Sequence, residues 1–302
     1  MLEVIVYRIL LLLVRMTSCI PLPLAQFTGK MLGRVAFLVP FNRRTVALDN
    51  LIQSLGPGMS ATEAKRLLRN VYIHFGQMLL EVPHIVSLNA RNLSRYVVFA
   101  SEEHFHDALK KGKGVLALTG HLGNWEMVSA VSAIRFGNTA MVARPMDFEP
   151  LERLVVDLRS RYGAEIIPKQ RSMRKLLSCL QANKIIGVLL DQNVDWYEGV
   201  FVNFFGRPAC TNKGLALLAL KTGAPVVPVF SARGKDGRYR IVIGKEIALI
   251  RTGDKLRDVE ENTALFTSII ERHIREQPEQ YFWFHNRWKT KNYCPLPPGY
   301  FS

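Results

Sequence analysis

A histidine and a glutamate stand where a buried strand would meet a helix. The segment from Thr119 to Glu126, Thr-Gly-His-Leu-Gly-Asn-Trp-Glu, follows the apolar run from Val115 to Leu118. A neutral imidazole accepts a proton near neutral pH, and a carboxylate on its second ring nitrogen fixes the tautomer and stabilises the imidazolium. We therefore interpret His121 as a general base that Glu126 orients. Such a pair needs no serine, cysteine or threonine nucleophile if it activates the hydroxyl of a substrate.

The spacing of five residues constrains the local structure. On one continuous helix His121 and Glu126 would point about 140° apart, because each residue turns roughly 100°. We therefore expect the strand to end at Thr119 and His121 to lie in a glycine-flanked turn. Asn124 would then cap a helix whose first turn carries Glu126. The same pattern also fits a structural histidine in a tight turn beside an ordinary first-turn acid.

The chain around this segment alternates short apolar runs with amphipathic stretches. This pattern predicts an α/β fold with a mostly parallel central sheet flanked by helices, preceded by a helical N-terminal region. Ser60 and Glu63 form a capping-box pattern at the start of one helix. Strands are expected at 115–118, 139–143, 165–167, 185–190, 226–230 and 239–243, and helices at 42–55, from 61 to about 78–82, 125–136, 149–162, 171–182, 212–222 and 258–276.

Polar residues follow several of these strands directly. His121 follows one strand, Arg144 the next and Asp191 a later one. Ser231 and Arg233 follow another. Because the carboxyl ends of parallel strands lie at one edge of a sheet, we expect these side chains to converge there.

Two further groups of side chains have more than one interpretation. Arg159 and Arg161 precede a basic cluster that could bind phosphate or form a solvated face. The aromatic run from Tyr281 to Phe284 is expected to pack as a C-terminal strand, with the basic residues from His285 onward facing a lipid headgroup. The cluster consists of Lys169, Arg171, Arg174 and Lys175.

Composition limits the class of partner. The 302 residues include 40 basic and 25 acidic side chains, a net charge of +15. Such a surface favours anionic partners such as acidic lipid headgroups, phosphorylated glycolipids, an acidic carrier protein or nucleic acid. The cysteines form no CxxC pair, which fits a reducing compartment and argues against zinc. Asp191 and Asp195 lack a third convergent ligand, so no metal site is predicted. The four cysteines are Cys19, Cys179, Cys210 and Cys294.

The N-terminus is apolar and basic. The stretch from Val4 to Val14 is shorter than the ~20 apolar residues that a membrane-spanning helix needs, and Glu3 and Arg15 argue against a signal peptide. Residues 1–42 contain Glu3 as their one acid, against four basic residues. We interpret 1–42 as a membrane-associated helical segment and 43–302 as the enzymatic domain. The alternative is an N-terminal helix buried against that domain.

The segment Gly-His-Leu-Gly-Asn-Trp-Glu at 120–126 resembles the His-x4-Asp/Glu block of the glycerolipid acyltransferase superfamily, in the glutamate form of the bacterial lipid A late acyltransferases. Three later segments, in the same order, are similar to that branch. The resemblance covers about residues 40 to 292. The later segments are Ala143-Arg144-Pro145, Leu190-Asp191-Gln192-Asn193 and the run from Pro278 to Thr290.

The resemblance implies an activity. An acyl chain would pass from an acyl-carrier-protein thioester to a hydroxyl of a lipid A precursor, at the cytoplasmic face of the inner membrane. His121 and Glu126 would be catalytic, without a metal or other cofactor. Partners would be the carrier protein or acyl-CoA, a glycolipid acceptor and the membrane surface, but not nucleic acid. Substrate-binding residues would be Asn124, Arg144, Asp191 and Arg159, with Arg161 as the alternative to Arg159.

Three other functions compete with this one. The His block is also similar to branches that acylate mannosylated phosphoinositides or other glycolipids and lysolipids, often from acyl-CoA. A basic protein that binds membranes or nucleic acid through a degenerate site would explain the charge, but not a glycine-flanked His and Glu at a strand end. An α/β-hydrolase is disfavoured because the pattern Gly-x-Ser-x-Gly is missing.

Overall fold

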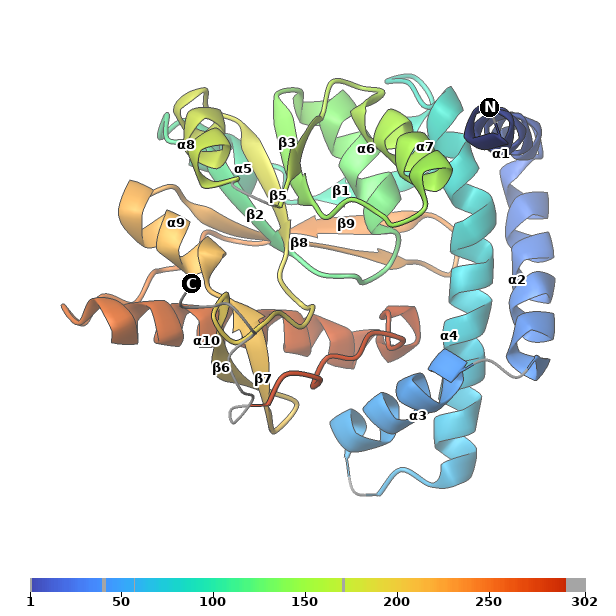
Figure 1. Ribbon diagram of the computed structural model, residues 1–302. Helices are drawn as coiled ribbons and strands as arrows, with labels where there is room; N and C mark the ends of the chain where they lie inside the picture. The colour runs from blue at the N-terminus through green and yellow to red at the C-terminus, as the bar shows by residue number, and fades with distance from the viewer. Residues whose placement is uncertain (1, 40–41, 57, 170–171, 292–302) are drawn as a thin grey trace.

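A parallel sheet forms the centre of the molecule. The computed structural model describes residues 2–39, 42–56, 58–169 and 172–291. Within them, seven strands form one sheet in the order β1-β9-β8-β2-β5-β3-β4 (Figure 1). Neighbours pair in parallel except β8 and β9. The strands are β1 (Val97–Ala100), β2 (Val115–Thr119), β3 (Thr139–Ala143), β4 (Glu165–Pro168), β5 (Ile185–Leu189), β8 (Val226–Arg233) and β9 (Tyr239–Ile243).

Helices cover both faces of the sheet. Along β2, Val115 and Ala117 point into one core, and Leu116 and Leu118 point into the other, as the two-residue period of a strand requires. The first core contains side chains of α5 (Glu103–Leu109), α6 (Trp125–Phe136) and α7 (Glu149–Ser160). The second contains those of α3 (Asn42–Leu55), α4 (Ala61–Glu81), α8 (Met173–Gln181), α9 (Gly214–Thr222) and α10 (Lys255–Glu276).

The α/β class and most of its elements are confirmed. Six strands and seven helices lie within a few residues of their predicted bounds, and the capping box of Ser60 and Glu63 is formed at the start of α4. Strand β1 and the antiparallel hairpin of β6 (Gly199–Phe204) and β7 (Arg207–Asn212) were not predicted. The aromatic run after Pro278 forms no strand. It makes one isolated β-bridge, between Tyr281 and Leu122.

Two apolar helices precede the domain in sequence and pack on its side. Helix α1 (Leu2–Ser18) lies against α7, and α2 (Leu22–Leu38) lies along α4. Tyr7, Leu10 and Val14 of α1 pack into the core below it. No single helix among the described residues is long and apolar enough to cross a membrane, whereas α1 and α2 pass that test only as a pair bent by 119°.

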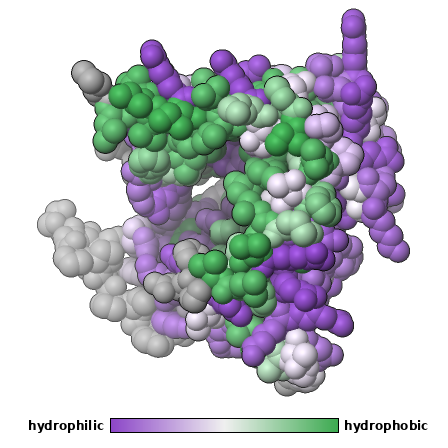
Figure 2. Space-filling view, turned by 90° about the vertical axis from the view of Figure 1, so that its right-hand side faces the viewer, coloured by the Kyte–Doolittle hydropathy of each residue, from purple (hydrophilic) through white to green (hydrophobic). Residues whose placement is uncertain are grey.

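The outer side of these helices is a continuous apolar surface, here called the apolar band. In Figure 2 hydrophobic side chains gather over α1 and down α2, beside a hollow. The band consists of Leu2, Val4, Ile5, Ile9, Leu12, Leu13 and Met16 on α1 and Leu24, Phe27, Leu32, Val35 and Leu38 on α2, all exposed.

Glycines bring α2 and α4 into backbone contact. A Cβ added at Gly76 would lie 2.3 Å from the carbonyl oxygen of Gly29 and 2.8 Å from the Cα of Gly33. Only glycine permits an approach this close.

A buried polar network joins the same helices to the sheet. The Glu81 carboxylate, at the end of α4, accepts hydrogen bonds from Arg233 on β8 (2.7 Å), from the Tyr239 hydroxyl on β9 (2.7 Å) and from Gln26 on α2 (2.9 Å). Burial raises the pKa of Glu81, but these hydrogen bonds and the charge of Arg233 outweigh burial and lower it. The network therefore holds a paired charge in the interior.

Gly76→Ala should destabilise the protein, because the added methyl group would overlap the backbone of α2. Overpacking of this kind costs about 1–3 kcal/mol, which would appear in the free energy of unfolding from urea titration. The matched control is Gly187→Ala in β5, where an added Cβ meets nothing closer than 3.8 Å. Equal effects of the two substitutions would contradict the contact.

Candidate active site

The turn between β2 and α6 presents His121 at the carboxyl end of the sheet. Helix α6 begins at Trp125, and the Asn124 side chain accepts a hydrogen bond from the Met127 amide (3.0 Å), so the predicted N-cap is confirmed. Gly123 has φ +65°, and a Cβ there would lie 2.2 Å from the Ser231 carbonyl oxygen. A side chain at Gly123 would therefore move the turn that carries His121.

Segments distant in sequence hold this turn. The Gly123 amide donates to the Gln280 carbonyl (3.0 Å), and the Phe282 amide donates to the His121 carbonyl (3.0 Å). On the opposite side the His74 ring of α4 bonds through Nε2 to the Gly123 carbonyl (3.1 Å). Burial, together with the charge of Arg233, lowers the pKa of His74 to about 4, so this ring is neutral and donates from Nε2. Sequence reasoning missed His74, which stands in an ordinary helical pattern.

Asp191, not Glu126, is the carboxylate that orients His121. One oxygen of Asp191 lies 2.8 Å from His121 Nδ1, and the other accepts the His121 backbone amide at 2.9 Å. The prediction that Glu126 would fill this position was wrong. Strands β2 and β5 are neighbours in register, with Thr119 opposite Leu189, so the residues two positions further on, His121 and Asp191, are brought side by side.

The pair leaves one nitrogen of the imidazole available. Burial of Asp191 raises its pKa, but the charge of His121 and two hydrogen bonds from that residue outweigh burial and lower it to about 2. Asp191 is therefore an ionised carboxylate that can only accept hydrogen bonds. His121 Nδ1 must carry the proton and donate it in this hydrogen bond. The other nitrogen, Nε2, faces the side-chain nitrogen of Gln192 at 3.2 Å. In this tautomer Nε2 carries the lone pair that accepts from Gln192, and it is the nitrogen that can take a proton.

Glu126 forms a different pair beside the histidine. Arg159 of α7 donates to both of its oxygens, at 2.8 and 2.6 Å, and the Trp125 indole donates to one of them at 3.0 Å. The Trp125 ring in turn packs edge-on against His121, with 4.9 Å between ring centroids. Glu126 thus fixes Trp125 and one arginine at the site without contacting the imidazole.

The other predicted binding residues lie differently. Arg144 is exposed and pairs with Asp147 at 3.6 Å, and Arg161 is exposed at the end of α7. Arg233 is buried in the Glu81 network. Arg159 is therefore the arginine of the two candidates on α7 that reaches Glu126.

The basic side chains near the site are partly neutralised or buried. Lys169 pairs with Glu198, and Lys175 pairs with Glu165; Arg171 of the same cluster and Cys294 lie outside the described residues. The prediction that the basic run after Phe284 faces a headgroup was wrong for Arg287, which is buried and donates to the Cys210 carbonyl at 2.7 Å. Its guanidinium also donates to the Thr211 hydroxyl of β7.

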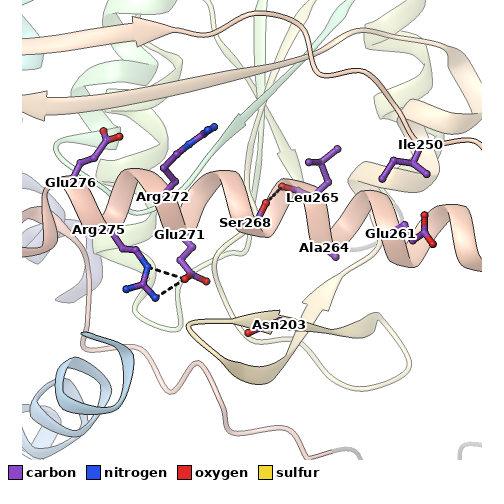
Figure 3. Close-up of a pocket in the computed structure, with 10 residues that line it drawn as sticks. All are labelled: Asn203, Ile250, Glu261, Ala264, Leu265, Ser268, Glu271, Arg272, Arg275 and Glu276. Atoms are coloured by element: carbon purple, nitrogen blue, oxygen red, sulfur yellow. Dashed lines mark hydrogen bonds and ion pairs between the residues drawn. The ribbon is translucent and has the colours of Figure 1, made fainter. Parts of the chain in front are cut away.

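Among the described residues several hollows lie around the sheet, and two of them are lined by aromatic neighbours of His121. An enclosed cavity of about 70 Å³ lies between the sheet and α6, and Thr119, Trp125 and Leu189 line part of it. An open groove of about 490 Å³ lies between α2, α4 and the segment 282–285. The third, of about 850 Å³, lies between α10 and the β6–β7 hairpin and is lined by ion-paired residues such as Arg275 and Glu271 (Figure 3). His121 lines none of the three, but Trp125 and Phe282 connect it to the first two.

Comparison with known proteins identifies the family. The model of the bacterial lipid A biosynthesis acyltransferases matches residues 1–290, so the chain belongs to that family. It is an acyltransferase, and the resemblance seen in the sequence is confirmed.

Individual relatives differ in substrate. The chain is 25% identical over 277 residues to the lipid A biosynthesis lauroyltransferase of Escherichia coli K12, covering 90% of this chain and 87% of the relative. It is 30% identical over 169 residues to a phosphatidylinositol mannoside acyltransferase of Mycobacterium tuberculosis, covering 53% of each. Among solved structures, the 1-acyl-sn-glycerophosphate acyltransferase PlsC of Thermotoga maritima aligns with 85% of this chain and 99% of its own at a TM-score of 0.40 and 14% identity.

Asp191→Asn should change the tautomer of His121, because an amide can donate to Nδ1 and leave the proton on Nε2. Nitrogen-15 NMR of histidine-labelled protein, with the His121 signals assigned by their loss in His121→Ala, reports which ring nitrogen is protonated. The matched variant Glu126→Gln should leave the His121 signals at their wild-type positions. A tautomer change in Glu126→Gln alone would contradict the pairing described here.

His74 should make the protein less stable in mild acid. The pKa of His74 is about 4 in the folded state, below its ordinary value of 6.5, so between these values the unfolded chain binds a proton that the folded protein does not. Stability is therefore lost as the pH falls from about 6.5 to about 4, at about 1.4 kcal/mol per pH unit for one group. His74→Gln keeps an N–H donor for Gly123 and should reduce the measured slope by that amount.

Urea unfolding at a series of pH values measures this slope. His106→Gln, at an exposed histidine of α5, should leave it unchanged. A slope in His74→Gln equal to that of the wild type would show that His74 is protonated in the folded protein.

Proposed function

We propose that this protein transfers a fatty acyl chain from an acyl-carrier-protein thioester to a hydroxyl of a lipid A precursor, with His121 as the general base. The observation that carries the proposal is the Asp191–His121 pair, with 2.8 Å between Oδ1 and Nδ1 and a lone pair on Nε2 that accepts from the exposed side chain of Gln192. A base that is positioned in this way can activate a hydroxyl that the substrate brings.

The reaction balances with these groups. The acceptor hydroxyl gives its proton to His121 Nε2 while its oxygen attacks the thioester carbonyl, forming a C–O bond and a tetrahedral oxyanion. Collapse of the oxyanion breaks the C–S bond, and the departing thiolate takes the proton from Nε2. Asp191 stabilises the imidazolium between these steps and returns to its starting state.

The negative charge on the oxyanion must be stabilised by positive charge close to its oxygen. The N-terminus of α6, which starts at Trp125, supplies the positive end of a helix dipole. Arg159, held by both oxygens of Glu126, adds a fixed cation close to the same turn. In this mechanism Glu126 is a positioning residue, and its effect is exerted through Arg159 and Trp125.

Charge and surface support the proposed donor and membrane location. A net charge of +15 favours an acidic carrier protein over a neutral one, by steering that weakens as salt is added. The apolar band on α1 and α2 fits a helix pair that lies in the surface of a membrane, here the cytoplasmic face of the inner membrane.

A second acceptor class is favoured by one observation. The identity to a phosphatidylinositol mannoside acyltransferase, 30% over 169 residues, supports an acceptor that is another glycolipid. The alternative from the sequence also includes a lysophospholipid acceptor and acyl-CoA as donor. The two candidate functions share the chemistry at His121 and differ in the acceptor and the donor.

His121→Ala should lower the turnover rate about 10²- to 10⁴-fold, the usual contribution of a general base. The assay supplies membrane-bound enzyme with tetraacylated Kdo-lipid A precursor and, in parallel, carrier-protein thioesters and acyl-CoA. His106→Ala, at an exposed histidine, is the matched control and should retain wild-type activity.

Undiminished activity in His121→Ala would refute the mechanism. Transfer to a phosphatidylinositol mannoside or a lysophospholipid, with none to the lipid A precursor, would select the second candidate.

A further inference from the structure

The groove beside α4 has the form of a binding site for a single alkyl chain. It follows one stripe of the helix, where Tyr72, Phe75, Gly76 and Leu79 are spaced so that they share a face. Side chains of α2 form the opposite wall, and Phe282 and Phe284 close the inner end. Its volume of about 490 Å³ lies in the range of small-ligand sites.

The inner end of the groove leads to the catalytic histidine. Phe75 packs against Phe282 with 5.4 Å between ring centroids and against Trp125 with 6.0 Å. Phe282 in turn lies 6.2 Å from the His121 ring. A chain in the groove is therefore separated from His121 by a single layer of aromatic rings.

The outer side of the groove is continuous with the apolar band. Leu32 belongs to the band and also lines the groove, and Leu79 opposite it is 62% exposed. A lipid could thus move sideways from a membrane into the groove without its chain crossing water, which would cost about 0.8 kcal/mol for each exposed methylene. A donor that arrives on a soluble carrier does not need such a route.

The groove also offers polar groups that the described residues leave unsatisfied. The Tyr72 hydroxyl is buried and has no hydrogen-bond partner among them, although a buried hydroxyl is normally paired. Arg43, exposed at the rim, forms no ion pair with any described carboxylate. One donor and one free cation at the end of an apolar groove match the anionic headgroup of a lipid.

We propose that this groove binds an acyl chain already present on the acceptor lipid, which enters laterally from the membrane and places an anionic headgroup at Arg43. The inference rests on the proposed function, since it assigns the acceptor to one side of His121. The donor then approaches His121 from another side.

Two variants test whether the groove binds the acceptor. In each, KM is measured separately for the acceptor and for the donor. Ala36→Phe fills the groove from α2 and should raise KM for the acceptor about tenfold or more, because excluding two methylene groups changes binding by about that factor. Donor KM and the preferred donor chain length should not change. The matched control is Thr28→Phe, at an exposed position of α2 outside both the groove and the apolar band.

Arg43→Gln tests the polar end at an exposed position. It should raise KM for a phosphorylated acceptor and leave KM unchanged for the same acceptor without its phosphate. Arg66→Gln, at an exposed arginine of α4 outside the groove, should leave both values unchanged.

A changed donor chain-length preference in Ala36→Phe, with acceptor KM unchanged, would overturn the inference and assign the groove to the donor. Unchanged kinetics in both variants would also overturn it. If the wild type transfers no acyl chain from any donor, the proposed function fails. Binding of the acceptor in phosphatidylcholine vesicles to the wild type and to Ala36→Phe, measured without donor, then still decides whether the groove holds a lipid chain.

Discussion

One buried carboxylate accepts hydrogen bonds from both the ring and the backbone of His121, and these two bonds determine the geometry of the site. Asp191 accepts from the ring nitrogen and from the main-chain amide of the same residue, so the side chain and the turn are fixed together. Two bonds to one residue remove both the rotation of the ring and the freedom of the loop. The remaining contacts of the turn, with Gln280, Phe282 and His74, preserve a position that the carboxylate has already set.

This arrangement depends on strand order. Strands β2 and β5 are separated by two strands and three helices in the sequence, yet they are neighbours in the sheet. Hydrogen bonds between parallel strands fix their register to a single residue, and a slip by one residue would turn Asp191 away from the imidazole. The precision of the site therefore comes from the backbone of the sheet.

Much of the fold could be predicted because its strands are short apolar runs between amphipathic helices, as β2 and β3 show. The hairpin of β6 and β7 was missed because its turn is made by Phe205 and Gly206, with φ +54° and +76°, and a phenylalanine there lacks the usual Asn-Gly signal. At the site, His121 and Asn124 could be placed from local spacing. The partner of His121 could not, because sequence proximity favoured Glu126, whereas strand pairing across 70 residues supplied Asp191.

The hydrogen bonds that hold the turn of His121 also affect the order in which the site forms during synthesis. His121 is made less than halfway through synthesis, but its carbonyl and the amide of Gly123 bond to Phe282 and Gln280, about 160 residues later. A nascent chain emerges from its N-terminus onward, so β2 can exist well before the turn after it is fixed. The bonds that Phe282 and Gln280 make to this turn therefore form only after all seven strands of the sheet have been synthesised.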